Sequence, residues 1–396
     1  MAIHYKVPYA LAVYGQEEID AVNTVLKSGN TMMGPAVREF ETRVAALFGK
    51  KHGIMVNSGS SANYLAFDVL KLPPGSEVIT PIVTFSTTVA PIVKNGLVPV
   101  FVDVKMGSYL IDVEKIEELI TPSTKALMIP SLMGNVPDYV KLRDIADRRG
   151  LWLIEDSCDT LGATLKGKPT GQWSHISTTS FYGSHIITAG GGGGMICVND
   201  PSWDRNCRVL RGWGRASEVA SDDIEERFRA KIDDMPYDAK FVFEEIGYNF
   251  LPLEMSAAFG MAQLNKLPAF TATRQKNFSE LRSFFSAYDK FFHLPEQPQN
   301  VKTNWLAFPL TLKDTPFTRL ELVKYLEAAG IQTRPLFTGN IMRQPGFRGI
   351  RNRMAGSYPV ADMIMRNSVV IGCHHGMDNE RMDYMKKTFA EFLDKY

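Results

Sequence analysis

Cysteine is scarce in this chain of 396 residues, and its four cysteines include no closely spaced pair. That absence argues against a zinc ribbon and against the disulfide framework of a secreted domain, and we predict no metal site. The chain also lacks any run near the ~18 apolar residues that span a bilayer. The stretch Met1–Tyr14 holds His4, Lys6 and Pro8, so it does not match a signal peptide. We expect a cytoplasmic protein.

Charge of neither sign is in excess, because 44 Lys and Arg residues stand against 43 Asp and Glu residues, a formal net charge of +1. This balance provides no electrostatic reason to expect a nucleic acid or an anionic membrane as a partner. A small anionic substrate stays open, since a local cationic cluster can bind one without a net charge. The apolar fraction of 45% and the charged fraction of 22% are ordinary for globular proteins and exclude a disordered chain.

Short apolar runs alternate with helix-like segments through the first two thirds of the chain. This alternation predicts an α/β fold whose mainly parallel sheet is covered by helices on both faces. Ligands of such sheets bind at the carboxyl ends of the strands, so functional side chains are expected directly after these runs. The expected strands are Gly53–Val56, Glu77–Thr80, Val98–Val102, Ala126–Pro130 and Leu151–Ile154.

The pattern changes after about residue 265. Phe270–Tyr288 predicts one long helix and Trp305–Leu312 an alternating strand. A further helix over Thr318–Ala329 ends at Gly330, a residue that commonly stops helices. The amphipathic segment Asp378–Tyr396 follows. We therefore predict a large domain over residues 1–265 and a smaller α+β domain over residues 266–396.

A glycine and small hydroxyl residues, Ser58-Gly59-Ser60-Ser61, lie between the first predicted strand and a helical pattern. Free backbone N–H groups at the positive end of a helix bind phosphate well, which makes Gly59 and Ser60 candidate phosphate ligands. Alternatively, Ser58 or Ser60 only caps the helix. The motif alone leaves both interpretations open.

Acidic residues end the predicted strand Leu151–Ile154, where Glu155 and Asp156 follow. An aspartate at this place can pair with a protonated ring nitrogen, as a pyridinium coenzyme requires, or it can cap the next helix. A third motif runs from Ser177–Phe181 through His185 to five glycines, Gly190–Gly194, and a strand-like segment. The glycines can form a flexible linker, but the abrupt return to an apolar strand favours a tight turn close to a ligand.

Taken in order, these motifs resemble the fold-type-I, pyridoxal-phosphate-dependent aminotransferases of nucleotide-linked keto-sugars, nearly from end to end. The resemblance implies that Asp156 binds the pyridine nitrogen and that Ser180 holds the coenzyme phosphate. It also implies that Phe85 covers the coenzyme ring and that Asp159 lies near the coenzyme's 3′ oxygen. Asn249, in Gly247-Tyr248-Asn249, would reach the phosphate of a neighbouring subunit, which implies a homodimer with shared active sites.

One departure changes the expected chemistry, because His185 stands where these aminotransferases carry the Schiff-base lysine. The segment Ser180–His185 is similar to that of the 3-dehydratases of 4-keto-6-deoxy sugars, the branch that includes GDP-4-keto-6-deoxymannose 3-dehydratase. Segments 86–88, 252–256 and 338–340 resemble the same branch. The glutamate of the usual Gly-Glu-Gly-Gly is replaced by glycine. The region Arg211–Ile246 lacks the cysteines of the iron–sulfur dehydratases, so neither a cluster nor a reductase partner is expected.

The resemblance implies a coenzyme held without a covalent lysine bond, most usefully as pyridoxamine 5′-phosphate. Imidazole has an ordinary pKa of about 6.5, which suits His185 to acid–base catalysis. The hypothesis is that His185 removes a proton from the coenzyme and assists departure of the C3 hydroxyl of a nucleotide-diphosphate keto-sugar, with L-glutamate restoring pyridoxamine phosphate. Arg334, Asn340 and Arg343 would approach the substrate, since cationic side chains suit a diphosphate. His374 and His375 could line the sugar site or form a polar turn.

Two other interpretations stay open from the sequence. The first is an ordinary sugar aminotransferase that uses another lysine, but Lys166 and Lys168 lie at the wrong spacing from the motif. The second is an inactive coenzyme-binding homologue, against which the complete set Asp156, Ser180 and Asn249 argues. The nucleotide (GDP, CDP or dTDP) and the stereochemistry of the sugar do not follow from these residues.

Overall fold

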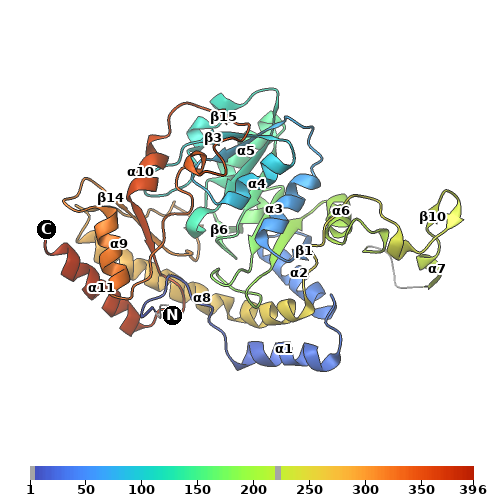
Figure 1. The fold of residues 1–396 in the computed structure, drawn as a ribbon, viewed down its shortest axis with the longest axis horizontal. Helices are drawn as coiled ribbons and strands as arrows, with labels where there is room; N and C mark the ends of the chain where they lie inside the picture. The colour runs from blue at the N-terminus through green and yellow to red at the C-terminus, as the bar shows by residue number, and fades with distance from the viewer. Residues whose placement is uncertain (1–4, 219–223) are drawn as a thin grey trace.

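The computed structural model describes residues 5–218 and 224–396 (Figure 1). The first four residues of Met1–Tyr14, and five residues of the cysteine-free region Arg211–Ile246, lie outside the described residues. No helix in the described part of the chain is both long enough and apolar enough to cross a membrane.

A mainly parallel sheet of eight strands, all but β15 from the first two thirds of the chain, has the order β1-β9-β8-β5-β4-β2-β3-β15. Only β9 runs antiparallel to its two neighbours, β1 and β8. The sheet confirms the predicted α/β class, and each of the five predicted strands is present within a few residues. Its strands are β1 (His52–Val56), β2 (Glu77–Pro81), β3 (Val98–Val102), β4 (Thr124–Pro130), β5 (Trp152–Asp156), β8 (Ile176–Ser180), β9 (Gly194–Val198) and β15 (Arg353–Met354).

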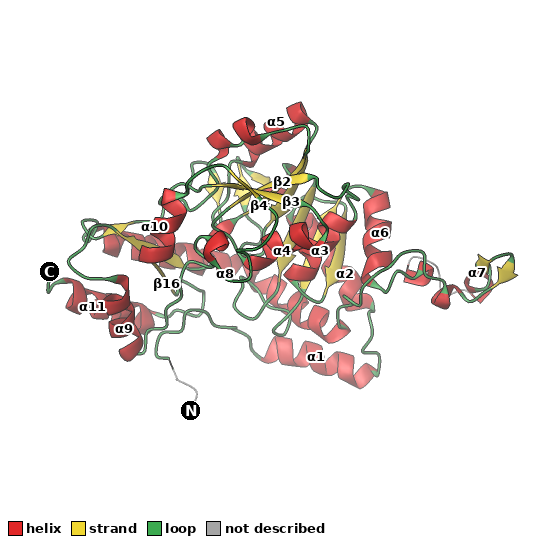
Figure 2. Ribbon diagram, turned by 45° about the horizontal axis from the view of Figure 1, so that its top comes forward, coloured by secondary structure: helices red, strands yellow, loops and turns green. Residues whose placement is uncertain are grey.

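Helices cover both faces of this sheet (Figure 2). In β4, Leu127 and Ile129 pack in one apolar cluster with α5, whereas Ala126 and Met128 pack in another with α3 and α6. This alternation follows from the two-residue repeat of a strand. The helices of this part are α1 (Gln16–Ser28), α2 (Pro35–Leu47), α3 (Gly59–Asp68), α4 (Ser86–Lys94), α5 (Tyr139–Arg149), α6 (Pro201–Arg211) and α7 (Ile224–Arg227).

The C-terminal part contains a three-stranded antiparallel sheet in the order β12-β14-β16, with α9, α10 and α11 beside it (Figure 1). The predicted strand Trp305–Leu312 and the predicted helix Thr318–Ala329 are found here, and the amphipathic segment Asp378–Tyr396 forms a helix. Its elements are β12 (Phe292–His293), β14 (Phe308–Leu312), α9 (Arg319–Ala328), α10 (Pro359–Asn367), β16 (Ser368–Ile371) and α11 (Asn379–Leu393). Two further small ladders pair β10 (Lys231–Ile232) with β11 (Met235–Pro236), and β6 (Thr164–Leu165) with β7 (Lys168–Pro169) and β13 (Val301–Lys302).

Helix α8 (Glu254–Ser286) connects the two parts and passes residue 265 without a break. It begins much earlier than the predicted Phe270, because it accommodates Pro268 in its interior although proline removes one helical hydrogen bond. Glu254 at its start accepts bonds from the N–H groups of Gly34, Ala36 and Val37 and so caps α2. The boundary between residues 265 and 266 stays a prediction.

Candidate coenzyme and active site

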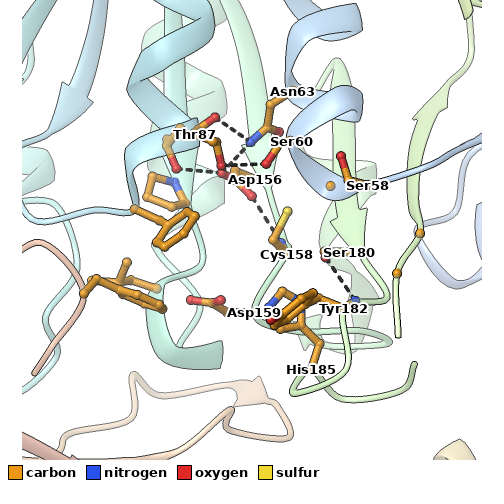
Figure 3. A pocket seen from close by; sticks show the side chains of 18 residues that line it. Ser58, Ser60, Asn63, Thr87, Asp156, Cys158, Asp159, Ser180, Tyr182 and His185 are labelled. Carbon is orange, nitrogen blue, oxygen red and sulfur yellow. Dashed lines mark hydrogen bonds between the residues drawn. The ribbon is translucent and has the colours of Figure 1, made fainter. Parts of the chain in front are cut away.

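A cavity of about 360 Å³ opens at the carboxyl ends of β1, β5 and β8, the edge of the sheet predicted to hold the chemistry (Figure 3). Seven of the predicted site residues line it: Gly59, Ser60, Phe85, Asp156, Asp159, Ser180 and His185. The other lining residues are Ser58, Asn63, Thr87, Thr88, Pro130, Leu132, Cys158, Tyr182, Gly192, Gly193 and Phe337. Chain segments far apart in sequence therefore meet in one pocket.

Asp156 ends β5 at the floor of this cavity and is held by three donors (Figure 3). Its Oδ2 accepts bonds from Thr88 Oγ1 at 2.8 Å and from Asn63 Nδ2 at 3.0 Å. Its Oδ1 accepts the Cys158 N–H at 3.2 Å. Thr178 Oγ1 in turn donates to Asn63 Oδ1 at 2.6 Å and fixes the orientation of that amide. Oδ1 is thus the oxygen with capacity for a ring N–H.

The N-terminus of α3 lines the cavity beside Ser180. Ser58 caps the helix by accepting from the Ser61 N–H, which confirms one interpretation of the motif without excluding phosphate binding. A Cβ atom on Gly59 would lie 2.6 Å from Ser180 Cβ and 2.7 Å from Cys158 Sγ. Glycine is therefore required for α3 and β8 to approach so closely. Backbone N–H groups at such a helix end, with the hydroxyls of Ser60 and Ser180, suit a phosphate.

The five-glycine segment is a tight turn, not a linker. Gly193 has a φ of 126°, a value that side-chain-bearing residues rarely adopt, and it lines the cavity with Gly192. A Cβ on Gly194 would lie 2.3 Å from the carbonyl oxygen of Ser58. The turn thus brings β9 directly against the start of α3, as the abrupt return to an apolar strand predicted.

His185 lies in the loop after β8, and its ring is 5.8 Å from that of Tyr182. Its Nδ1 is buried and has no hydrogen-bond partner within the described residues. Burial lowers the pKa of the imidazole to about 4; the backbone of Ser180 opposes this shift and the Arg274 cation adds to it. The imidazole is therefore neutral at neutral pH and able to accept a proton.

Asp159 lies on the same side of the cavity as His185 in Figure 3 and accepts the Met133 N–H at 2.9 Å. Burial raises the pKa of its carboxyl to about 8; the Met133 bond opposes the shift and the Asp156 charge adds to it. Asp159 is then protonated at neutral pH and can donate a hydrogen bond, whereas an ionised carboxylate can only accept one.

Two aromatic rings close another side of the cavity. The rings of Phe85 and Phe337 lie 5.7 Å apart at an angle of 69°. Phe337 belongs to the C-terminal part, and the Thr338 hydroxyl next to it donates to the carbonyl of Thr84 at 2.6 Å. This bond joins the two loops that carry the rings.

Four predicted site residues lie outside the cavity of this single chain. Asn249 is exposed, and its backbone pairs with Gly212. Arg334 is exposed beside the ring of Tyr9. Asn340 donates to Asp362 at 2.8 Å, and Arg343 forms an ion pair with the same carboxylate. The contacts of Asn340 and Arg343 within the chain are thus those of a structural cluster, and their predicted roles toward a substrate stay predictions.

The remaining open residues are also placed. His374 bonds to the carbonyl of Pro8 and to the N–H of Gly376. These bonds favour the interpretation of His374 as part of a polar turn and not as a residue of the sugar site. Lys166 and Lys168 belong to the β6–β7 hairpin. No lysine or arginine lines the cavity in the described part of the chain. No group of three or more His, Cys, Asp or Glu side chains there is placed to hold a metal ion.

Asn63, Thr88 and Phe337 were missed as individual site residues by sequence reasoning. Thr88 lies in Ser86-Thr87-Thr88, a segment that already resembled the dehydratase branch. Asn63 follows the Ser58–Ser61 motif by less than one helical turn, so a polar residue on the first turn of α3 was an available signal. Phe337 carried no signal, because only the packing of the C-terminal part brings it to Phe85.

The arrangement fits pyridoxal phosphate. It provides an aspartate for the ring nitrogen, a helix N-terminus and hydroxyls for the phosphate, and an aromatic ring to cover the coenzyme. The fold and this pocket define a fold-type-I pyridoxal-phosphate-dependent enzyme. The chain belongs to the DegT/DnrJ/EryC1/StrS aminotransferase family, whose sequence model matches residues 13–390.

Individual relatives extend this assignment. Lipopolysaccharide biosynthesis protein RfbH of Salmonella typhimurium is 38% identical over 401 residues, which cover 98% of this chain and 92% of that protein. GDP-4-keto-6-deoxy-D-mannose 3-dehydratase of Yersinia pseudotuberculosis is 34% identical, with 93% and 94% covered. A crystal structure of GDP-4-keto-6-deoxymannose-3-dehydratase with a trapped PLP-glutamate geminal diamine superposes with a TM-score of 0.88 at 30% identity, covering 97% of this chain and 100% of the other. The chain is thus an enzyme of the pyridoxal-phosphate-dependent nucleotide-sugar family.

Proposed function

We propose that this enzyme is a pyridoxamine-phosphate-dependent 3-dehydratase. It removes the C3 hydroxyl of a nucleotide-linked 4-keto-6-deoxyhexose, gives a 3-deoxy-4-keto sugar and ammonia, and uses glutamate to restore the coenzyme. The observation that carries the proposal is the neutral imidazole of His185 in a cavity that no lysine lines in the described part of the chain. The 3-dehydratases among its relatives support the same conclusion.

The residues that would hold the coenzyme divide into three groups. Asp156, oriented by Thr88 and Asn63, would pair with the ring nitrogen and keep it protonated. The start of α3 and Ser180 would bind the phosphate, and Phe85 would cover the ring. Protonated Asp159 would donate to the 3′ oxygen. The bound coenzyme supplies an amine that links to the sugar ketone and a ring that takes up electrons.

His185 would move the protons of the reaction. Because its imidazole is neutral, it can accept the proton released from the C4′ carbon. The imidazolium formed has a low pKa and is therefore a strong acid, which favours passing the proton to the departing C3 hydroxyl. General acid–base assistance of this kind is worth about 10²–10⁴-fold in rate. The reaction balances because the sugar loses one oxygen atom and the coenzyme gains one. The coenzyme amine would become an aldehyde, and its nitrogen would leave as ammonia.

We further propose a cytoplasmic homodimer that shares its active sites and needs neither an iron–sulfur cluster nor a reductase. The cavity has no cation in the described part of the chain, although the substrate carries a diphosphate. Asn249 lies exposed and away from this cavity, as expected for a residue that serves a neighbouring subunit. Mixing Asp156→Ala and Asn249→Ala subunits tests the sharing, because a mixed dimer would regain one intact site. Failure to regain activity would contradict shared sites.

The activity is tested by incubating the protein with pyridoxamine phosphate, glutamate and GDP-4-keto-6-deoxymannose, followed by mass spectrometry of the sugar. We expect a glutamate-dependent product lighter by one oxygen atom, with ammonia released, and no such product from His185→Asn. An amino group in place of the ketone would instead show the aminotransferase. CDP- and dTDP-linked sugars, assayed in parallel, identify the nucleotide. Failure to bind pyridoxamine phosphate would show an inactive homologue.

A further inference from the structure

Arg274 lies on α8 behind the loop that carries His185, and its side chain is fully buried. Its Nη1 donates to the carbonyls of Trp305 and Leu306, at 3.0 Å each. Its Nη2 donates to the carbonyl of His185 at 3.3 Å, and its Nε donates to His375 Nδ1 at 3.2 Å. These bonds use four of the five N–H donors of the guanidinium. One side chain thus ties the His185 loop to two segments of the C-terminal part.

No carboxylate pairs with Arg274 in the described residues, which is unusual for a buried cation. Arg211 on α6, the other buried arginine among the described residues, has an ordinary ion pair with Glu41 at 2.8 Å. Removing a charge from water is costly, and neutral carbonyls offset only part of that cost. Burial accordingly lowers the pKa of Arg274 to about 10, which still leaves it charged at neutral pH. A methionine of similar length would fill this place without that cost, so simple packing does not explain the arginine.

Arg274 does not line the cavity, so it has no direct contact with a substrate there. We propose that Arg274 is a positioning residue for the proposed reaction: it fixes the backbone of His185 against Trp305 and Leu306 and holds a permanent positive charge beside the imidazole. The catalytic part of this inference rests on the proposed function. The positioning part is supported by the four hydrogen bonds of the guanidinium.

The charge has a consequence for the titration of His185. Besides burial, the Arg274 cation lowers the pKa of His185, and the backbone of Ser180 raises it. The other titratable groups around the two residues are Tyr182 on the same loop, Asp156, Cys158 and Asp159 in the cavity, and Tyr9, Cys373, His374 and His375 around Arg274. Burial raises the pKa of Tyr9 and of the Cys373 thiol and lowers that of His375, so these three are neutral at neutral pH.

The experiment compares Arg274→Met and Arg274→Lys with Arg282→Met. Arg282 lies on the same helix and donates to the carbonyl of Pro295, away from His185, and it controls for the same change of residue type. The pKa of His185 is measured by NMR on isotope-labelled histidine, with the signal assigned by His185→Asn. Steady-state rates against pH and circular dichroism spectra are recorded for the same proteins.

In Arg274→Met we expect the pKa of His185 to rise toward its ordinary value of about 6.5. The acid limb of the rate profile should move upward with it, because more of the imidazole is protonated at a given pH. We also expect kcat to fall about 100-fold with little change in KM for the sugar, since misplacing a catalytic group by 1 Å costs about that much. Arg282→Met should change none of these quantities.

Arg274→Lys distinguishes the effect of the positive charge from the effect of the hydrogen bonds. It also keeps the inference testable if Arg274→Met does not fold. Lysine keeps the positive charge but not the planar donor fork, so the pKa of His185 should stay low while kcat falls about 10-fold. An unchanged His185 pKa in Arg274→Met, or wild-type kcat in Arg274→Lys, would overturn the inference. If the wild-type protein shows no dehydration, the proposed function fails, but the NMR titration still tests whether Arg274 controls His185.

Discussion

Gly59 offers the sharpest test of where the coenzyme phosphate binds. Gly59→Ala adds one methyl group at the start of α3. That carbon would lie 2.6 Å from Ser180 Cβ, 2.7 Å from Cys158 Sγ and 3.1 Å from Ser180 Oγ. Favourable contacts between carbon atoms lie at about 3.5–4.0 Å, so α3 and β8 must separate by about 1 Å. The two sides of the predicted phosphate site would move apart by the same amount.

The expected magnitude follows from this displacement. Overpacking by one methyl group in a tight interior costs about 1–3 kcal/mol of folding free energy. If a similar loss falls on the phosphate contacts, the affinity for pyridoxamine phosphate drops about 10–100-fold, because about 1.4 kcal/mol is a factor of ten. Isothermal titration calorimetry measures the affinity, and urea unfolding of the coenzyme-free protein measures the stability.

Gly183→Ala is the matched control, because the nearest atom to its added carbon is 3.8 Å away and its φ is not positive. We expect a change in stability within about 0.5 kcal/mol for this variant. Wild-type affinity for pyridoxamine phosphate in Gly59→Ala would refute the reasoning. The turn before α3 would then not be the phosphate site.

Three further predictions concern single side chains of the cavity. His185→Lys should form a covalent adduct with pyridoxal phosphate that borohydride traps, detected by mass spectrometry, and should lose about 10²–10⁴-fold in dehydration rate; no adduct would show that residue 185 cannot reach the coenzyme. Thr88→Val removes a hydrogen bond to the Asp156 carboxylate, worth about 1.5–3 kcal/mol, and should weaken coenzyme binding in a fluorescence titration by about 10-fold or more. Thr84→Val is its control, since the buried Thr84 hydroxyl has no partner within the described residues, and equal effects of the two changes would contradict the role of Thr88. The raised pKa of Asp159 means that the coenzyme-free folded protein keeps a proton which the unfolded chain releases from about pH 4 upward, so stability should fall as pH rises to about 8. Asp159→Asn should reduce the difference in unfolding free energy between about pH 6 and about pH 9, measured by urea unfolding. An unchanged difference would show that another group causes the pH dependence.

Part of the site was predictable because its signals are local in the sequence. Asp156 lies two residues after the apolar run Leu151–Ile154, and His185 lies five residues after Ser180. Strand ends of a parallel sheet meet at one edge. The five glycines Gly190–Gly194 predicted a tight turn, whereas Gly59 was predicted as a phosphate ligand and its close approach to Ser180 is seen only in the structure. Arg334, Asn340 and Arg343 were chosen by resemblance and chemical type alone, and within this chain Asn340 and Arg343 bind Asp362.

The class of fold, the strand positions and the order of the coenzyme motifs follow from local patterns, since periodicity and turn residues act over a few neighbouring positions. The distant residues that support these motifs are seen only in the folded chain. Asn63 and Thr88 meet Asp156 through bonds that span 93 and 68 positions, and Arg274 reaches the His185 carbonyl across 89. No local pattern encodes such pairs, because they arise when helices pack on a sheet and bring buried polar groups to the partners that burial obliges them to find.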